Sequence, residues 1–254
     1  MTLFFYDKTF EGLLTAVFDA YSRKTFPDQL LKTGDIAPLF TDEDHTVITD
    51  EDHVKRVWNA IEKKQSKQAC NMLLHVWLSE KAGSDLLLFR YICKLVSDNR
   101  FVARNMGDDD FLEVHQIARK VAHEGHYICQ FARFQKAADD IFFAPVRPVH
   151  NALPLAVDHF TDRFGDQQWV LYDLRRNYGF YYDLHTAREI TFTNDNDHFL
   201  TDKLDESLMA EDEKLFQDLW KGYFKAMIIK ERINLRLQRQ HMPVRFWRNL
   251  TEKQ

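Results

Sequence analysis

Glycine, proline and cysteine are scarce in this chain of 254 residues, which contains 8 Gly, 6 Pro and 3 Cys. Low glycine and proline contents exclude collagen-like and low-complexity chains. The cysteines are widely spaced and form no CxxC pair, which indicates reduced thiols rather than a disulfide framework or a zinc site. We expect Cys70, Cys93 and Cys129 to be small buried apolar residues, with a nucleophilic thiol as the alternative.

Long apolar runs are also absent. The nearest candidate, residues 72–96, is interrupted by five charged side chains, and no segment reaches the roughly 18 uninterrupted apolar residues of a membrane span. The first eight residues carry neither a basic region nor the apolar run of a signal peptide. We therefore expect a cytoplasmic protein that does not bind a membrane.

Several motifs that are typical of particular enzyme classes are missing. The sequence has no GxGxxG, GxxxxGK[ST], HExxH or GxSxG motif, no zinc-type spacing of Cys and His, and no cluster of three cysteines. The missing cysteine cluster excludes a radical SAM cluster of the usual kind in this chain, and the missing glycine-rich loops disfavour a P-loop enzyme. We expect no cofactor and no metal ion.

The apolar pattern that remains predicts an α+β fold, mostly helical, with a small antiparallel β-meander near residues 141–193. Helices are predicted over residues 10–21, from 51 or 53, over 66–79, from 84, over 109–139 and over 211–237. Strands are predicted at 4–6, 46–49, 141–146, 169–173, 178–182 and 189–192. We interpret residues 1–254 as a single domain with a helical part, 1–139, and an α+β part, 140–254.

Charge is distributed unevenly along the chain. The net charge is −5, which argues against a generally basic nucleic-acid-binding protein. Residues 35–54 contain seven carboxylates and no Lys or Arg, whereas residues 221–254 have a net charge of +7. The basic end indicates a polyanion or an acidic partner surface, and a solvated helix face is the alternative.

The predicted helix around residues 110–138 carries the most informative pattern. Four basic or titratable side chains fall within roughly 40° of one another at about 100° per residue: His115, Arg119, His126 and Arg133. No carboxylate lies among them, so we interpret them as an anion-binding ridge for DNA or a phosphorylated ligand. Pairing with carboxylates of neighbouring elements is the competing interpretation. A shared metal ion is disfavoured, because His115 and His126 are about 16 Å apart along the axis.

Polar residues near the predicted meander form two weaker candidate sites. His150 and His159 have the chemistry of an acid or a base that Asp158 or Asp173 would orient, although loop and capping hydrogen bonds explain the same residues. Two further arginines, Arg175 and Arg176, lie on a predicted hairpin beside tyrosines and could grip a phosphate while a base stacks. Tyrosines in a sheet are more often core or cross-strand pairs.

Many separate patches along the chain carry a family resemblance. They are Tyr6 to Leu13, Ala20-Tyr21, Val114-His115, Arg119 to Val121, Glu124, His126, Phe131 to Phe134, Ala144 to Val146, Pro148, His150-Asn151, Leu153 to Leu155, His159-Phe160, Arg163-Phe164, Gln168-Trp169, Asp173, Arg176, Tyr178-Gly179, Trp220, Tyr223, Met242-Pro243, Arg245, Trp247 and Leu250. In this order they resemble the bacterial "probable DNA metabolism protein" family, a domain of unknown function. Tyr127 and Gln130 depart from that family's pattern, which has a basic residue and a glycine there.

The resemblance implies a role in DNA repair or modification beside a radical SAM enzyme that carries a helix-hairpin-helix part. Some family members are fused to a uracil-DNA-glycosylase-like domain, which makes such a protein a second expected partner. We therefore expect an accessory component that contacts DNA or its partner through the ridge and the basic C-terminal segment, including Arg245. The alternatives are an enzyme that uses His/Asp acid–base chemistry on DNA or nucleotides, and a purely structural interaction protein.

Overall fold

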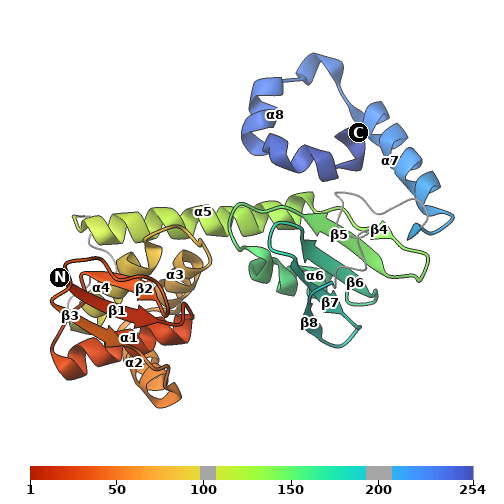
Figure 1. Cartoon of the computed structure of the whole chain (residues 1–254). Coiled ribbons are helices and arrows are strands. Elements are labelled where there is room, and N and C mark those ends of the chain that lie inside the picture. The colour runs from red at the N-terminus through yellow and green to blue at the C-terminus, as the bar shows by residue number, and fades with distance from the viewer. Residues whose placement is uncertain (98–106, 193–207, 254) are drawn as a thin grey trace. The chain divides into compact units, whose positions relative to one another are not determined.

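The computed structural model describes residues 1–97, 107–192 and 208–253. It divides into two compact units, Met1–Val121 and Ala122–Gln254. The boundary falls inside the longest helix, α5 (Asp109–Phe131), whose two halves therefore belong to different units (Figure 1).

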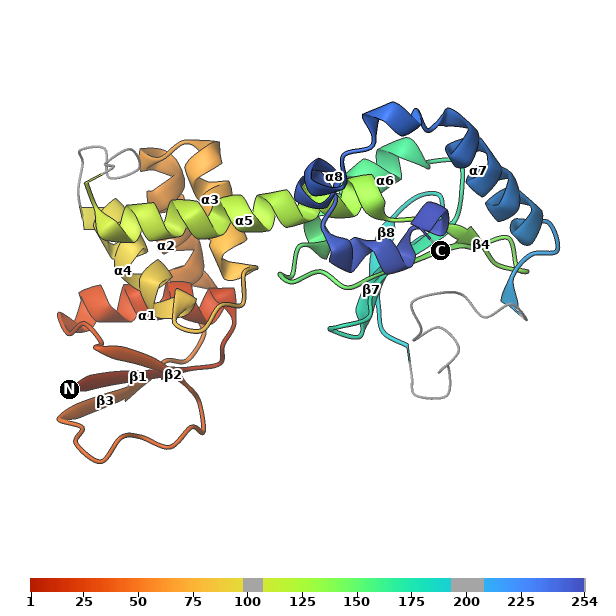
Figure 2. The same cartoon turned by 90° about the horizontal axis from the view of Figure 1, so that it is seen from above.

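The N-terminal unit is a small parallel sheet covered by helices. Its strands are β1 (Thr2–Tyr6), β2 (Gln29–Lys32) and β3 (Glu43–Thr46), and its helices are α1 (Phe10–Arg23), α2 (Glu51–Lys64), α3 (Lys67–Trp77) and α4 (Ser84–Ser97). The strand order is β2-β1-β3, and β1 pairs in parallel with both neighbours. Helices α1–α4 lie on one side of this sheet (Figure 2).

The three-stranded sheet was not predicted from the sequence. The pattern predicted a helical region with only two short strands, at 4–6 and 46–49. The outer strands have the sequences QLLK and EDHT, which are four residues long and show no alternation of apolar and polar side chains. Their pairing with β1 therefore comes from the tertiary fold.

Side-chain caps begin the helices of this unit where the sequence predicted them. The Thr9 side chain accepts a hydrogen bond from the Gly12 N–H, and the Asp50 carboxylate accepts from the N–H groups of Asp52 and His53. The Ser66 side chain accepts from the Ala69 N–H at the start of α3. Such oxygens satisfy N–H groups that have no partner inside the helix.

The C-terminal unit is built around a five-stranded sheet of order β4-β5-β6-β7-β8. After the second half of α5, its elements are β4 (Gln135–Lys136), β5 (Phe142–Val146), η2 (Leu153–Ala156), α6 (Val157–Arg163), β6 (Trp169–Asp173), β7 (Tyr178–Tyr182), β8 (Ala187–Ile190), α7 (Glu213–Met227), η5 (Lys230–Arg232), α8 (Leu235–His241), η6 (Val244–Asn249) and η7 (Thr251–Lys253). Strands β6, β7 and β8 form the predicted antiparallel meander, and β5 joins β6 in parallel. The α+β prediction is confirmed.

Two predicted helices proved too long. The helix predicted over 109–139 ends at Phe131, because the next residues turn into β4 and the Phe134 ring packs against Phe160 and Trp169. The helix predicted over 211–237 is broken after Met227, where Ile228 is extended. Adjacent β-branched isoleucines disfavour the helix there, and Asn234 starts a new one by capping α8.

Alternating side chains of β6 pack on the two faces of the C-terminal sheet. Val170 and Tyr172 belong to a buried cluster with Phe143. Trp169 is 1% exposed and packs against Phe134, Phe160 and Tyr182 instead. A third cluster fixes the C-terminal segment to the end of α5 through Phe131, Phe246 and Leu250.

Among the described residues, no helix combines the length and apolar character that crossing a membrane requires. The sequence predicts a loop at 99–108, and residues 202–208 are polar and acidic; both segments lie almost entirely outside the described residues.

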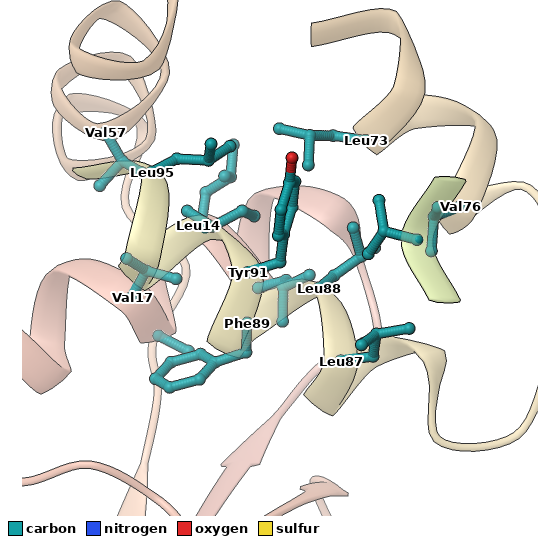
Figure 3. Close-up of a cluster of buried hydrophobic side chains, with 14 of the residues drawn as sticks. Leu14, Val17, Val57, Leu73, Val76, Leu87, Leu88, Phe89, Tyr91 and Leu95 are labelled. Atoms are coloured by element: carbon teal, nitrogen blue, oxygen red, sulfur yellow. The ribbon is translucent and has the colours of Figure 1, made fainter. Parts of the chain in front are cut away.

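The core of the N-terminal unit buries one hydroxyl without a partner. Figure 3 shows Tyr91 of α4 among leucine and valine side chains from several helices. The ring is 0% exposed, and its hydroxyl has no hydrogen-bond partner in the described part of the chain. Burial, followed by the charge of Asp108, raises the pKa of Tyr91 to about 12. Tyr6 is buried as completely, but its hydroxyl donates to Asp85 at 3.0 Å.

We expect Tyr91→Phe to raise the free energy of unfolding by about 1 kcal/mol, because an unpaired buried hydroxyl costs roughly 1–3 kcal/mol in lost hydration. Urea unfolding followed by far-UV circular dichroism measures the change. Tyr6→Phe is the matched control and should lower the stability, since it removes a satisfied hydrogen bond. Equal losses in both variants would contradict the assignment of Tyr91 as unpaired.

Candidate functional site

A buried carboxylate organises the polar side of the C-terminal unit. Glu124 lies on α5 with a side chain that is 4% exposed. One carboxylate oxygen accepts a hydrogen bond from the Val149 N–H at 2.8 Å, and the other accepts from the Arg245 guanidinium. Charge-assisted hydrogen bonds of this kind are what make a buried carboxylate tolerable. Glu124 therefore ties α5, the loop after β5 and the C-terminal segment together.

A second buried carboxylate holds the turn between β6 and β7. Asp173 is 0% exposed and accepts from the Arg175 N–H at 2.8 Å and from the Arg176 guanidinium at 2.9 Å. The same guanidinium donates to the Pro148 and Val149 carbonyls. Arg175 also donates to the Val149 carbonyl, at 3.1 Å, but its side chain is exposed. Asp173 therefore has a structural environment, with its oxygens turned toward the turn it stabilises.

A third carboxylate, Glu252, forms an ion pair with Arg133. The Glu252 side chain is 3% exposed and accepts from the Arg133 guanidinium at 2.8 Å and from the Trp220 indole N–H at 3.1 Å. Burial would raise the pKa of Glu252, but these donors outweigh it and hold the pKa below the ordinary range. Arg133, Arg176 and Arg245 are thus each engaged with a buried carboxylate.

The four residues of the predicted anion-binding ridge do not all lie on one exposed helix face. His115 and Arg119 lie on the half of α5 in the N-terminal unit, and His126 lies on the half in the C-terminal unit; all three are exposed. Arg133 lies beyond the end of α5, because the helix stops at Phe131, and it is half-buried. His126 contacts the Gln130 amide at 2.8 Å.

The exposed surface of α5 is nonetheless free of negative charge over most of its length. Its exposed side chains between residues 114 and 130 are His115, Gln116, Arg119, Lys120, His123, His126 and Gln130. Neither Arg119 nor Lys120 is paired with a carboxylate in the part of the chain that the structure describes. His115, Arg119 and Lys120 belong to the half of α5 in the N-terminal unit, and His123 and His126 belong to the half in the C-terminal unit.

The C-terminal unit also contains a pocket of about 670 Å³. Aromatic rings form much of its wall, and they come from the segment after α5, from β5, α6, β6 and α7: Phe134, Phe142, Phe160, Phe164, Trp169, Phe216 and Trp220. Polar side chains at the wall include His159, Arg163 and Gln167. The volume lies inside the range of about 300–1,000 Å³ that is typical of small-molecule sites.

The four predicted catalytic candidates do not converge on this pocket. Only His159 lines it; Asp158 is exposed, Asp173 is fully buried beneath Arg176, and His150 is half-buried in the loop after β5. Cys129 also lines the pocket, but burial raises the pKa of its thiol, which disfavours the reactive thiolate. No cluster of three or more His, Cys, Asp or Glu suited to a metal ion occurs among residues 1–97, 107–192 and 208–253.

Sequence reasoning missed Glu124 and Trp169 as site residues. Glu124 falls on the same helix face as Ile117, Val121 and Ile128, and a carboxylate on an apolar stripe signals a buried, partnered charge. No comparable signal marks Trp169, because the pocket is assembled from elements far apart in the chain.

Comparison with known proteins identifies the family. Residues 82–252, about two thirds of the chain, match the model of a domain of unknown function, DUF4130. The chain belongs to this family. No curated protein and no solved structure matches the chain. The matched range contains the pocket, the exposed face of α5 and the carboxylates Glu124, Asp173 and Glu252, so these features lie within the domain that defines the family.

We expect Arg245→Ala to lower the free energy of unfolding by about 2–3 kcal/mol. Removing one partner of a fully buried ion pair costs roughly 3–5 kcal/mol, and Arg245 is partly solvated. Urea unfolding measures the loss, and Arg239→Ala, an exposed position on α8, is the control. Adding Glu124→Gln to Arg245→Ala should recover part of the loss. A change below about 0.5 kcal/mol would contradict the structural role.

Proposed function

We propose that this protein is an accessory component of a DNA repair or modification system, which contacts DNA through the exposed face of α5 and acts beside a radical SAM enzyme. The observation that carries the DNA contact is the absence of carboxylates among the exposed α5 side chains between residues 114 and 130. The enzyme partner rests on the family resemblance, which also makes a uracil-DNA-glycosylase-like protein a second candidate partner.

The α5 face suits a phosphate backbone. Arg119 can present a planar fork to a phosphate, and Lys120 adds a compact positive charge one residue along the helix. Three exposed histidines on the same helix can donate hydrogen bonds to phosphate oxygens or to sugars. Because the net charge of the chain is −5, DNA contact must depend on such a local surface rather than on general attraction.

The buried ion pairs narrow the set of arginines available to DNA. Arg133, Arg176 and Arg245 each neutralise a buried carboxylate, so withdrawing them to bind phosphate would leave an uncompensated charge inside the fold. The exposed members of the predicted set, His115, Arg119, His126 and Arg175, carry no such cost. We therefore assign the DNA contact to the exposed members that lie on α5, which are His115, Arg119 and His126.

An enzymatic function finds less support in the geometry. Acid–base catalysis needs its groups within reach of one bound substrate. Of the four predicted candidates, only His159 lines the pocket. Asp173 is fully buried and forms an ion pair with Arg176. A purely structural role is also less well supported, because the exposed α5 cations have no carboxylate partners among the described residues.

Arg119→Ala combined with Lys120→Ala should weaken binding to double-stranded DNA by about tenfold at low salt. If each side chain neutralises one phosphate, the slope of log K against log salt concentration should become shallower by about 1.8. Fluorescence anisotropy with a labelled duplex across a salt series measures both quantities.

Lys63→Ala combined with Lys67→Ala is the matched control, since it removes two exposed positive charges from α2 and α3. The control should bind like the unmodified protein. Equal weakening in both double variants would show general electrostatic attraction and would argue against a defined α5 contact. Absence of binding by the unmodified protein would contradict the DNA contact and would leave only the contact with a protein partner.

A further inference from the structure

The pocket of the C-terminal unit has walls suited to a flat ring. Trp169 stands in aromatic contact with Phe134 and Phe160, at 6.2 Å between ring centroids in both cases. Phe134 also contacts Phe164 at 5.3 Å, and the Phe160 and Phe164 rings are nearly parallel, with an interplanar angle of 10°. Surfaces made of such rings bind planar ligands by stacking or by edge contact.

Two buried donors on residues that line this pocket have no partner among the described residues. The Trp169 side chain is 1% exposed, and its indole N–H finds no acceptor among the described residues. The Nε–H of Arg133, at the same pocket, is also buried without an acceptor, although the other guanidinium nitrogens are bonded. An indole N–H that is buried normally finds an acceptor, because an unpaired donor costs free energy. Both of these donors therefore lack an acceptor, and both belong to residues that line the pocket.

Positive charge without a partner carboxylate lies at the same pocket. Arg163 is exposed and its guanidinium is 5.6 Å from the centroid of the Phe164 ring. Neither Arg163 nor the exposed His159 forms an ion pair within the described part of the chain. The lining carboxylate Glu213 already accepts from the Lys136 N–H and the Gln217 amide, and Glu252, next to the lining residue Thr251, accepts from Arg133.

We propose that this pocket binds a nucleotide, as one heteroaromatic base joined to a phosphate. The base would occupy the aromatic walls and offer a carbonyl oxygen or ring nitrogen to the Trp169 N–H. The side-chain amide of Gln167 can donate and accept along the edge of such a base. Arg163 and His159 would take the phosphate.

Two sources supply this chemistry: a free deoxynucleoside 5′-monophosphate, and one unstacked nucleotide of single-stranded DNA. The inference deepens the proposed function but rests on the pocket alone. It would stand even if the α5 face did not contact a duplex.

Isothermal titration calorimetry of the full chain tests whether it binds free nucleotides or single-stranded DNA, and whether the base is needed for binding. The probes are the four common deoxynucleoside 5′-monophosphates with dUMP, deoxyribose 5-phosphate, inorganic phosphate, and single-stranded ten-nucleotide homopolymers. At least one monophosphate or one homopolymer should bind, with deoxyribose 5-phosphate at least tenfold weaker. Saturable binding of the monophosphate identifies free nucleotides as ligands, and binding of the homopolymer alone identifies single-stranded DNA.

Two variants test the residues assigned to the base and to the phosphate. Trp169→Phe keeps an aromatic wall but removes the N–H, and it should weaken binding of the nucleotide by about tenfold, as expected for one lost hydrogen bond. Arg163→Ala should weaken binding by a similar factor and reduce its salt dependence. Arg239→Ala, which removes an exposed arginine that does not line the pocket, should leave binding unchanged.

Several results would overturn the proposal. They are no binding of any monophosphate or homopolymer, equal binding of inorganic phosphate and nucleotide, and unchanged binding by both folded pocket variants. Failure of the two inferences can be told apart with the α5 double variant, Arg119→Ala with Lys120→Ala. That variant should retain nucleotide binding while it loses duplex affinity.

Discussion

The C-terminal unit depends on one buried carboxylate. Glu124 is surrounded by protein, so it is tolerated only because the Val149 N–H and the Arg245 guanidinium both donate to it. Those two donors belong to segments that are distant in the chain from α5 and from each other. Satisfying Glu124 therefore fixes the loop after β5 and the C-terminal segment in one arrangement, and Val149 is held at its carbonyl by Arg175 and Arg176 as well.

The arginines of this unit consequently serve two different purposes. Arg133, Arg176 and Arg245 neutralise Glu252, Asp173 and Glu124, and these pairs hold the fold together. Arg163 has no carboxylate partner among the described residues and lies at the aromatic pocket. We expect a negatively charged ligand to bind at Arg163 rather than at a paired arginine, because a paired arginine would leave a buried carboxylate without its partner.

Much of the secondary structure could be predicted from the sequence. The starts of the helices at Thr9, Asp50 and Ser66 follow from capping side chains, and the meander follows from short aromatic-rich strands separated by turn residues. The parallel sheet of the N-terminal unit could not be predicted, because β2 and β3 carry no alternating pattern. The early end of α5 was also hidden, since it depends on Phe134 packing against distant rings.

The candidate site was less accessible to sequence reasoning than the fold. Helical spacing placed His115, Arg119 and His126 correctly on the exposed side of α5. It could not reveal that Arg133 lies past the helix end and pairs with Glu252, which is 119 residues away. The pocket draws its walls from α5 to η7, so no local pattern announces it.

The indole N–H resonance of Trp169 tests the central claim most directly. The chain has five tryptophans, so a ¹H–¹⁵N correlation spectrum contains at most five indole signals, and Trp169→Phe identifies the one from Trp169. We expect that signal to move downfield on saturation with the bound nucleotide and to stay in place with deoxyribose 5-phosphate, because the proposal places the base, and not the sugar or the phosphate, at the N–H. An unchanged Trp169 signal in a nucleotide-saturated protein would contradict the account.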